Sequence, residues 1–259
     1  MDCVCAPPSS QVYYRQYAPG GYDGASCTVM PAAATLDCAV LTVLLGAYAQ
    51  QEADVDAGVE LWWDGYWHPY VAAATSAGHL YPAPGTRIPG DHPVSLQFSV
   101  SAPEVAQLAV TDLADGAEQV LSVNVPSSEW YPGSAIIQPK LLVGIVPATP
   151  TSSQSGQQCE QFSGSAAVPV RGLTLTMDGR MSPWLSGEVA SCSRCPGPGY
   201  AVPDITLGGQ DVLVSVSTSG QAAIHPAAQP GPPPWAFLVG GAAAMALAAA
   251  GVLVWRRTA

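Results

Sequence analysis

The segment "PVSLQFSVSAPEVAQLAVTDLADGAEQVLSVNV", residues 93–125, decides the fold class of this chain. Its first part alternates apolar and polar residues, and the apolar ones are Val94, Leu96, Phe98 and Val100. A period of two is what a strand with one buried face requires. The tetrapeptide "LADG" at 113–116 separates two such runs, and Asp115-Gly116 can supply the positive φ of a hairpin turn. The segment therefore predicts antiparallel strands joined by tight turns.

Other short apolar or alternating runs stand between turn residues along most of the chain. They include "VELWWDGYW", "AIIQPKLLVGIV", "VRGLTLTMDG" and "DVLVSVSTS". Many short strands at regular spacing are typical of a sandwich or barrel. We expect an all-β fold, a mostly antiparallel β-sandwich, built either as one domain with long loops or as two small domains.

The C-terminal segment 235–255, "WAFLVGGAAAMALAAAGVLVW", contains no charged or polar side chain apart from its end tryptophans. As a helix it would reach roughly 31 Å, close to the ~30 Å thickness of the hydrocarbon part of a bilayer. Trp235 and Trp255 stand where aromatic rings prefer the membrane interface, and Arg256 and Arg257 follow directly. The positive-inside rule then predicts a single-pass transmembrane helix with a cytoplasmic C-terminus and the rest of the chain outside the plasma membrane.

This topology divides the chain into five parts. We expect an N-terminal extension (1–24), an extracellular domain (25–220), a Pro-rich stalk (221–234), the transmembrane helix (235–255) and a cytoplasmic tail (256–259). A tail-anchored arrangement with the domain in the cytoplasm conflicts with the arginines.

Export requires a signal, and the first residues lack a basic region followed by an apolar run. The single candidate apolar core, "CAVLTVLLGAYA" at 38–49, begins late and lacks nearby basic residues. We expect a buried strand there, which leaves a signal peptide, or a start upstream of Met1, undecided.

Composition excludes one class of partner. The formal net charge is −11 with 10% charged residues, and Lys140 is the single lysine of the chain. Without a cluster of basic residues we expect no nucleic-acid binding. The partners we expect are the membrane and an extracellular peptide, protein or glycan, with no cofactor. The abundance of Ala, Gly, Pro and Val indicates a GC-rich bacterial source.

The chain has seven cysteines, and outside the cell cysteines usually form disulfides. The pairs we expect are Cys27 with Cys38, and Cys159 with Cys192 or Cys195. The alternative reading of "CSRC" at 192–195 as a redox or zinc half-site lacks a second CxxC or a nearby histidine.

No metal site is expected elsewhere either. The four histidines lack the spacing of metal ligands, and "EADVDAGVE" at 52–60 lacks the liganding pattern of a calcium loop. We interpret this run as a solvated acidic loop.

The aromatic segment "LWWDGYWHPY" at 61–70 is the candidate ligand-binding strand. Its proposed binding residues are Trp62, Trp63, Asp64, Tyr66 and Trp67. In a strand, some of these side chains must point to opposite faces, so one face can be core while the other presents flat rings to a peptide or sugar. Core packing alone is the alternative.

Five segments also follow one another in a suggestive order. They are "ASCTVMP" (25–31), "TVLLGAYAQQEADVDAG" (42–58), "ELWWDGYWHPY" (60–70), "IPGDHPVSLQFSV" (88–100) and "PSSEWYPGSAIIQP" (126–139). Over roughly residues 25–180 this order resembles that of the glutamic peptidases (eqolisins), acid-acting β-sandwich enzymes. The resemblance implies a β-sandwich, and in that family a Gln–Glu pair is thought to activate water.

The resemblance places Gln50 or Gln51 near the family's Gln and Glu129 near its Glu. A second fit, of the family's S-A-E-W-I-V-E-like strand onto "SAIIQP", would instead leave Ile136 or Gln138 where a carboxylic acid is needed. The family's W-V-G-x-D-G strand reads "LLGAYA" here. A missing carboxyl removes the mechanism, because amide and carboxyl must converge on one water.

We therefore expect a non-catalytic binding or structural module displayed at the cell surface. The first alternative is a membrane-anchored glutamic-type endopeptidase acting in acid. The second is a subunit of an envelope or secretion complex held through its helix.

Overall fold

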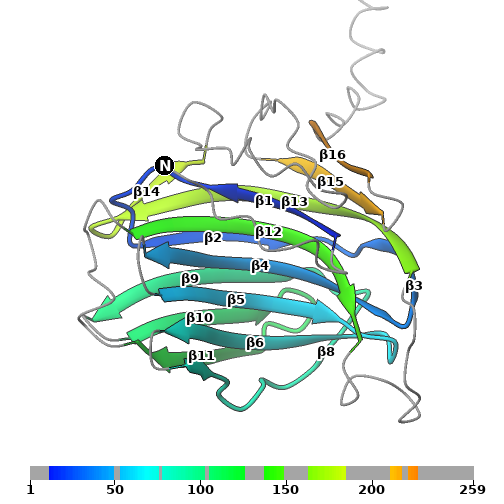
Figure 1. Cartoon of the computed structure of the whole chain (residues 1–259), viewed down its shortest axis with the longest axis horizontal. Helices are drawn as coiled ribbons and strands as arrows, with labels where there is room; N and C mark the ends of the chain where they lie inside the picture. The colour runs from blue at the N-terminus through cyan, green and yellow to red at the C-terminus, as the bar shows by residue number, and fades with distance from the viewer. Residues whose placement is uncertain are drawn as a thin grey trace, which may run out of the picture. The chain divides into compact units, whose positions relative to one another are not determined.

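The computed structural model of the chain describes residues 12–49, 53–75, 78–102, 105–125, 137–148, 163–184, 211–217 and 221–226. Within these ranges the chain forms sixteen β-strands and no helix (Figure 1). All the strand pairs are antiparallel, which confirms the predicted fold class.

The first of two sheets has seven strands, in the order β1-β12-β4-β5-β6-β7 with β8 also paired to β6. Its members are β1 (Val12–Tyr17), β4 (Ala39–Ala49), β5 (Ala53–Leu61), β6 (Tyr66–Thr75), β7 (Gly78–Leu80), β8 (Ile88–Pro89) and β12 (Ile137–Pro147).

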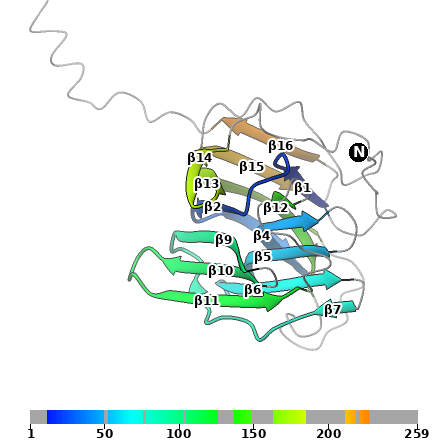
Figure 2. The same ribbon diagram turned by 90° about the vertical axis from the view of Figure 1, so that its left-hand side faces the viewer.

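The second sheet has nine strands, in the order β11-β10-β9-β2-β13-β15-β16 with β3 and β14 also paired to β13. Its members are β2 (Gly24–Val29), β3 (Ala33–Asp37), β9 (Val94–Ala102), β10 (Val105–Asp112), β11 (Glu118–Asn124), β13 (Ser163–Met177), β14 (Arg180–Pro183), β15 (Val212–Ser217) and β16 (Gln221–Pro226). Figure 2 shows the two sheets as layers, with β4, β5 and β6 in one and β9, β10 and β11 in the other.

The hairpin predicted from "LADG" joins β10 to β11. Gly116 has φ +79°, the left-handed conformation that glycine adopts without strain. The N–H of Gly116 donates to the carbonyl of Asp112 at 2.8 Å, and the N–H of Ala117 donates to the Asp115 carboxylate at 2.7 Å. Turn chemistry thus sets the register in which Thr111 faces Glu118.

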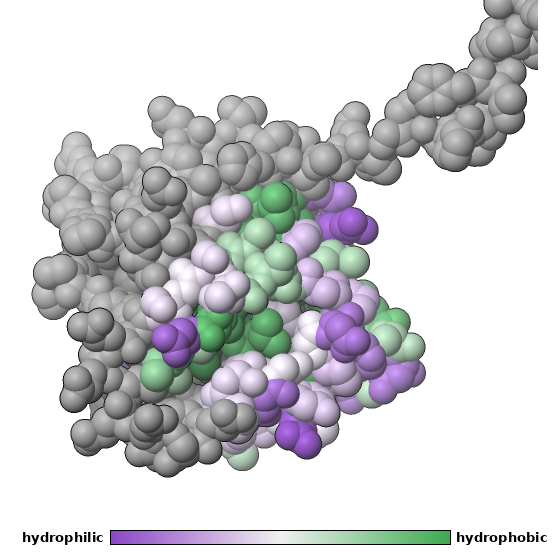
Figure 3. All heavy atoms as spheres, turned by 90° about the vertical axis from the view of Figure 1, so that its right-hand side faces the viewer, coloured by the Kyte–Doolittle hydropathy of each residue, from purple (hydrophilic) through white to green (hydrophobic). Residues whose placement is uncertain are grey.

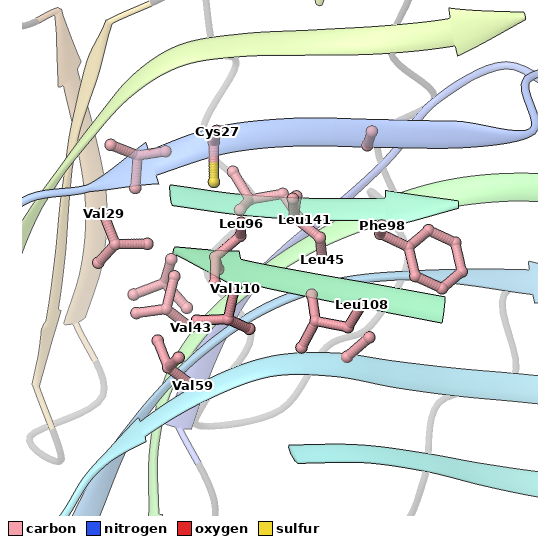
Figure 4. Packing of buried hydrophobic residues seen from close by; sticks show 14 of the residues in the cluster. Cys27, Val29, Val43, Leu45, Val59, Leu96, Phe98, Leu108, Val110 and Leu141 are labelled. Carbon is pink, nitrogen blue, oxygen red and sulfur yellow. The ribbon is translucent and has the colours of Figure 1, made fainter. Parts of the chain in front are cut away.

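The core lies between the two layers and is mainly aliphatic, with Trp67, Trp184 and Phe98 as its largest side chains. It follows from the alternation of each strand, since every second residue points to the other sheet. Figure 4 shows part of this core, and its labelled members are Cys27, Val29, Val43, Leu45, Val59, Leu96, Phe98, Leu108, Val110 and Leu141. Burying one such side chain contributes about 1.5–3 kcal/mol, so packing of this cluster is the main source of stability.

The segment 38–49, considered above as a signal-peptide core, supplies β4 in the middle of the seven-stranded sheet. Its neighbours are β12 on one side and β5 on the other. It is therefore the buried strand that we expected. The outside of the sandwich is mixed, and Figure 3 shows one side of it, where a small hydrophobic patch lies among hydrophilic residues.

The sheets extend beyond the expected domain limits at both ends. Strand β1 lies within the segment predicted as an N-terminal extension, where it pairs with β12, and β16 occupies the beginning of the predicted stalk. Among the described residues no helix is long and apolar enough to cross a membrane, and the predicted span at 235–255 lies outside them.

Candidate functional site

The candidate site is the outer face of the seven-stranded sheet, the face turned away from the nine-stranded sheet. A row of facing residues crosses five adjacent strands, from the edge strand β1 to β6. From β1 to β6 this row is Tyr17, Lys140, Gly46, Asp56 and Ala72. Because the core takes the alternate residues of each strand, the side chains of this row belong to the outer face.

Lys140 occupies the middle of this face and has no exposed surface. Its Nζ atom donates a hydrogen bond to the carboxylate of Asp54 and lies 2.6 Å from Oδ1 of Asp56. The two aspartate side chains keep 35% and 40% of their surface exposed. The lysine is thus buried beneath the carboxylates, which stay in contact with water and limit the cost of burying the three charges.

Lys140 reaches β5 because the intervening strand has no side chain in its path. Gly46 on β4 lies between Lys140 and Asp56, and a Cβ atom there would stand 3.2 Å from Cε of Lys140. Tyr17 and Tyr48, on the two strands that flank β12, bring their rings within 6.0 Å of each other. These rings border the same part of the face as the lysine.

An apolar patch follows one row further along the strands. Leu44 and Leu142 are buried against each other, with Tyr70 packed against them. Burial raises the pKa of the Tyr70 phenol well above its ordinary value, and the negative charges of Asp56 and Glu60 raise it further. Tyr70 therefore stays a neutral hydrogen-bonding group beside the acidic row.

A second cluster lies where β5 ends and β6 begins. The Trp62 ring stacks on the His68 ring at 3.9 Å between centroids, and Nε1 of Trp62 donates to Glu60 at 2.9 Å. Nε2 of His68 lies 3.0 Å from the Asp64 carboxylate. Burial raises the pKa of the Glu60 carboxyl, the hydrogen bond from Trp62 lowers it, and the charge of Asp56 raises it, with a net rise.

Two further residues of the aromatic segment complete this cluster. The guanidinium of Arg87 lies 4.3 Å from the Tyr66 ring centroid, a cation–π distance, and 3.7 Å from Asp64. Trp63 is 45% exposed. Trp62, Trp63, Asp64 and Tyr66 thus lie at one accessible end of the sheet.

Trp67 does not share that position. It is completely buried in the core, because the alternation of β6 turns it toward the nine-stranded sheet while Tyr66 and His68 point outward. A direct ligand contact of the kind we expected is not open to Trp67. The two-faced character of this strand, by contrast, is as predicted.

The acidic run 52–60 is not the solvated loop that we expected. Residues 53–61 form β5, in which Val55, Ala57 and Val59 enter the core while Asp54, Asp56 and Glu60 take the outer face. Charge density suggested a loop, but the alternating apolar residues determine the strand. The described residues contain no group of side chains that could hold a metal ion.

The predicted disulfide between Cys27 and Cys38 is wrong, since Cys27 is a free cysteine. The alternation of β2 turns its thiol into the core, where Figure 4 shows it beside Leu96, and burial raises its pKa to about 12. Cys159, Cys192 and Cys195 lie outside the described residues.

The remaining site predictions also fall outside the described part of the chain. Gln50, Gln51 and Glu129 lie there, as do Trp235, Trp255, Arg256 and Arg257. The structure therefore does not place the Gln–Glu pair that the family resemblance implied.

Sequence reasoning missed the Lys140 cluster, although two signals pointed to it. Lys140 is the single lysine of the chain, and it stands inside an otherwise uncharged strand where a charge needs a partner. Asp54 and Asp56 are two residues apart, the spacing that puts both on one face of a strand. The pairing of β12 with β5 through β4 could not be read from either signal.

Comparison with known proteins yields the fold and no more. No family model matches the chain. A search of curated proteins finds no match either. Among solved structures, SCP-B, a member of the Eqolisin family of peptidases in complex with the tripeptide Ala-Ile-His, aligns with 17% identity and a TM-score of 0.53 over 80% of this chain and 98% of its own.

Scytalido-glutamic peptidase with a peptide-based transition-state analog aligns with 15% identity and a TM-score of 0.51, over 80% of this chain and 98% of its own. The chain therefore has an eqolisin-like β-sandwich fold, as its sequence resemblance implied. At these identities the likeness concerns the fold alone.

Of the two fits of the motif, the structure describes part of one. Strand β12 begins at Ile137 and includes Gln138, whereas Glu129 and Ile136 lie outside the described residues. The charged residue that the structure places on this strand is Lys140.

Proposed function

We propose that this protein binds extended polypeptide segments on the outer face of its seven-stranded sheet without cleaving them. The observation that carries the proposal is Lys140, held by Asp54 and Asp56 in the middle of that face. An acid-acting peptidase needs a carboxyl that can hold a proton beside the water it activates. On this face a lysine instead donates a hydrogen bond to Asp54 and forms an ion pair with Asp56.

The fold likeness supports a peptide as the ligand. One of the similar structures holds the tripeptide Ala-Ile-His and another a peptide-based analog. The outer face of this chain offers aromatic rings on which an extended segment can pack. They are those of Tyr17, Tyr48, Tyr70 and Trp62.

Charge favours a neutral or basic segment. Asp54 and Asp56 bring two negative charges to a single lysine, and both keep contact with solvent. Asp64 adds a further carboxylate at the end of the sheet, where Arg87 and His68 lie nearby. A strongly acidic segment would be repelled from the centre of this face.

Binding would be tested with unfolded, alkylated lysozyme, a basic polypeptide without structure of its own. Tyr48→Ala and Trp62→Ala should each weaken its retention on the immobilised protein about tenfold, in the range of one aromatic contact. Met181→Ala is the matched control, because Met181 is 61% exposed on the other sheet. Equal loss in all three variants, or no loss in any, would contradict the proposed surface.

Cleavage would be tested with the same substrate between pH ~2 and ~7, a range that spans the ~4.3 reference pKa of Glu. We expect no products. The second candidate function, a glutamic peptidase, is favoured by the fold likeness and makes the opposite prediction. Cleavage that disappears in both Gln51→Ala and Glu129→Gln would establish it and overturn ours.

We further propose that the sandwich is displayed outside the plasma membrane by a helix at 235–255. The support is the uncharged length of that segment and the arginines after it. Protease added to intact cells should remove the sandwich and leave a C-terminal tag protected. If the tag is digested while the sandwich stays protected, the orientation in the membrane is opposite to the one we propose.

A further inference from the structure

We propose that Lys140 and Asp54 join to form an intramolecular amide bond, with Asp56 as the group that transfers the proton. The bond would be a covalent link between β12 and β5, across β4. It goes beyond peptide binding and does not depend on it, since the aromatic rings that would contact the segment are the same with an ion pair or with an amide.

The first support is contact between the reacting groups. Nζ of Lys140 donates directly to Asp54, so the amine already touches the carboxyl that it would acylate. The lysine side chain has no exposed surface. Attack requires the amine in its neutral form, which Lys140 reaches by giving a proton to the carboxylate that it contacts.

The second support is the position of Asp56. Its Oδ1 atom lies 2.6 Å from Nζ of Lys140. The same oxygen is buried and makes no hydrogen bond of acceptable geometry in the described structure. An oxygen close to the nitrogen and without another partner is well placed to take a proton from it.

The third support is access for the leaving group. Asp54 keeps 35% of its side chain exposed while the lysine has none. Water formed at Asp54 can therefore leave to the solvent, and the buried amine is shielded from other electrophiles. Condensation also removes one positive and one negative charge from the face, which ends the cost of keeping that pair desolvated.

The reaction needs no oxidant and no cofactor. A proton first passes from the ammonium of Lys140 to the carboxylate of Asp54, which leaves an amine and a carboxylic acid. The nitrogen attacks Cγ of Asp54, Asp56 accepts a proton from the nitrogen and donates it to a hydroxyl on Cγ, and the C–O bond breaks. The products are the amide and one water, with Asp56 again ionised.

The mass of the intact, reduced full-length protein tests the link. We expect a mass lower than that of the sequence by one water. Asp54→Asn is the matched variant, because its carboxamide would lose ammonia and give the same linked product as the natural chain. Lys140→Arg and Asp54→Ala should both retain their full calculated masses.

Trypsin provides a second readout, since Lys140 is the single lysine. Amide formation blocks cleavage after residue 140, so denatured linked protein should yield peptides 16–87 and 88–171 joined together. A chain with the full mass that is cut into 88–140 and 141–171 would overturn the proposal. A link to Asp56 instead of Asp54 would overturn the assignment of the acyl group.

Asp56→Ala tests the proton transfer. We expect this variant to fold, as judged by a strand-type circular dichroism spectrum, and to retain its full mass. A normal mass loss in Asp56→Ala would show that Asp56 has no part in the reaction. If Asp56→Ala does not fold, Asp56→Asn, which keeps the shape of the side chain, replaces it with the same expected result.

Discussion

Gly46 lies directly beneath the side chain of Lys140, and the absence of a Cβ atom there lets the lysine pass from β12 to β5. A Cβ atom at Gly46 would stand 3.2 Å from Cε of Lys140 but only 2.0 Å from the carbonyl oxygen of Val55. The lysine stem is flexible and could move by a few tenths of an ångström. The carbonyl of Val55 belongs to the backbone of the sheet and cannot move in this way. The contact with this carbonyl therefore determines the cost of a side chain at residue 46.

Gly46→Ala should therefore lower the free energy of unfolding by about 1–3 kcal/mol, the usual cost of overpacking. Urea unfolding followed by tryptophan fluorescence measures it. Gly58→Ala is a matched comparison, since its Cβ atom would lie 2.1 Å from the carbonyl oxygen of Val43 and the Lys140 side chain is not among its nearest atoms. We expect a similar loss in both variants. An unchanged stability in Gly46→Ala would show that the strands adjust freely at this point.

Measured against the chain in which Lys140 and Asp54 are an ion pair and not yet an amide, Lys140→Met should destabilise the sandwich because it leaves Asp54 and Asp56 without a cation. Removing one partner of a fully buried ion pair costs about 3–5 kcal/mol, and we expect about 2 kcal/mol here because both carboxylates keep contact with water. The triple variant Lys140→Met, Asp54→Asn, Asp56→Asn should regain part of the loss, since no charge remains. A triple variant less stable than Lys140→Met would contradict this electrostatic account.

Most of the fold could be predicted from local patterns. The alternation around Phe98 and the turn at Gly116 each depend on a few neighbouring residues. The strand and the turn predicted from them are therefore found in the structure. The error at 52–60 has a physical cause as well. Four acidic residues in nine suggested a loop. Yet three small apolar residues between them suffice to hold a central strand in place when Lys140 of β12 compensates the carboxylates on the strand's other face.

The site was less accessible to sequence reasoning because it depends on pairing between distant strands. Lys140 and Asp54 are 86 residues apart, and their meeting depends on the order β12-β4-β5. The wrong pairing of Cys27 has a similar origin. Cys27 and Cys38 belong to one region of the sequence, but the face to which a strand turns its thiol is set by the register of the whole sheet.

Glu60→Gln should stabilise the protein at neutral pH. Burial raises the pKa of Glu60 in the folded state, so the fold favours the protonated acid. The favourable contribution of Glu60 to the free energy of unfolding is therefore fully present below its unfolded pKa of ~4.3. It is lost as the pH rises through the pKa of Glu60 in the folded state. A glutamine stays neutral and still accepts the hydrogen bond from Trp62. The melting temperatures of the natural chain and of Glu60→Gln should differ most at pH 7 and converge near pH 4. A difference that grows as the pH falls would contradict this prediction.

Cys27 should react with a thiol reagent only after unfolding. Its thiol is in the core, and burial raises its pKa to about 12, so at pH 8 it is both inaccessible and protonated. Mass spectrometry after brief alkylation at pH 8, with and without denaturant, locates the label by peptide. Modification of Cys27 in the native protein at the denatured rate would contradict the packing of β2.

His92 and Asp112 should stabilise the fold most between about pH 4 and 6.5, the reference values of the two groups. The hydrogen bond to Asp112, 2.8 Å long, raises the pKa of His92 in the folded state. Burial tends to raise the pKa of Asp112, but the hydrogen bonds from His92 and the Ala114 N–H lower it overall. The contribution of His92 to the free energy of unfolding is thus complete below its unfolded pKa and is lost as the pH rises through its folded pKa. The contribution of Asp112 is complete above its unfolded pKa and is lost as the pH falls through its folded pKa.

His92→Gln should consequently lower the melting temperature more at pH 5.5 than at pH 8.5, where the native histidine has also lost its charge. The exposed His79 stacks on Tyr81, and the described structure gives it no carboxylate partner, so His79→Gln serves as the control and should change the melting temperature little at either pH. Because His92 precedes β9 and Asp112 ends β10, the pair closes the end of the β9–β10 pair, next to the turn at 113–116. A loss that is equal at both pH values would mean that His92 acts through packing and not through its charge.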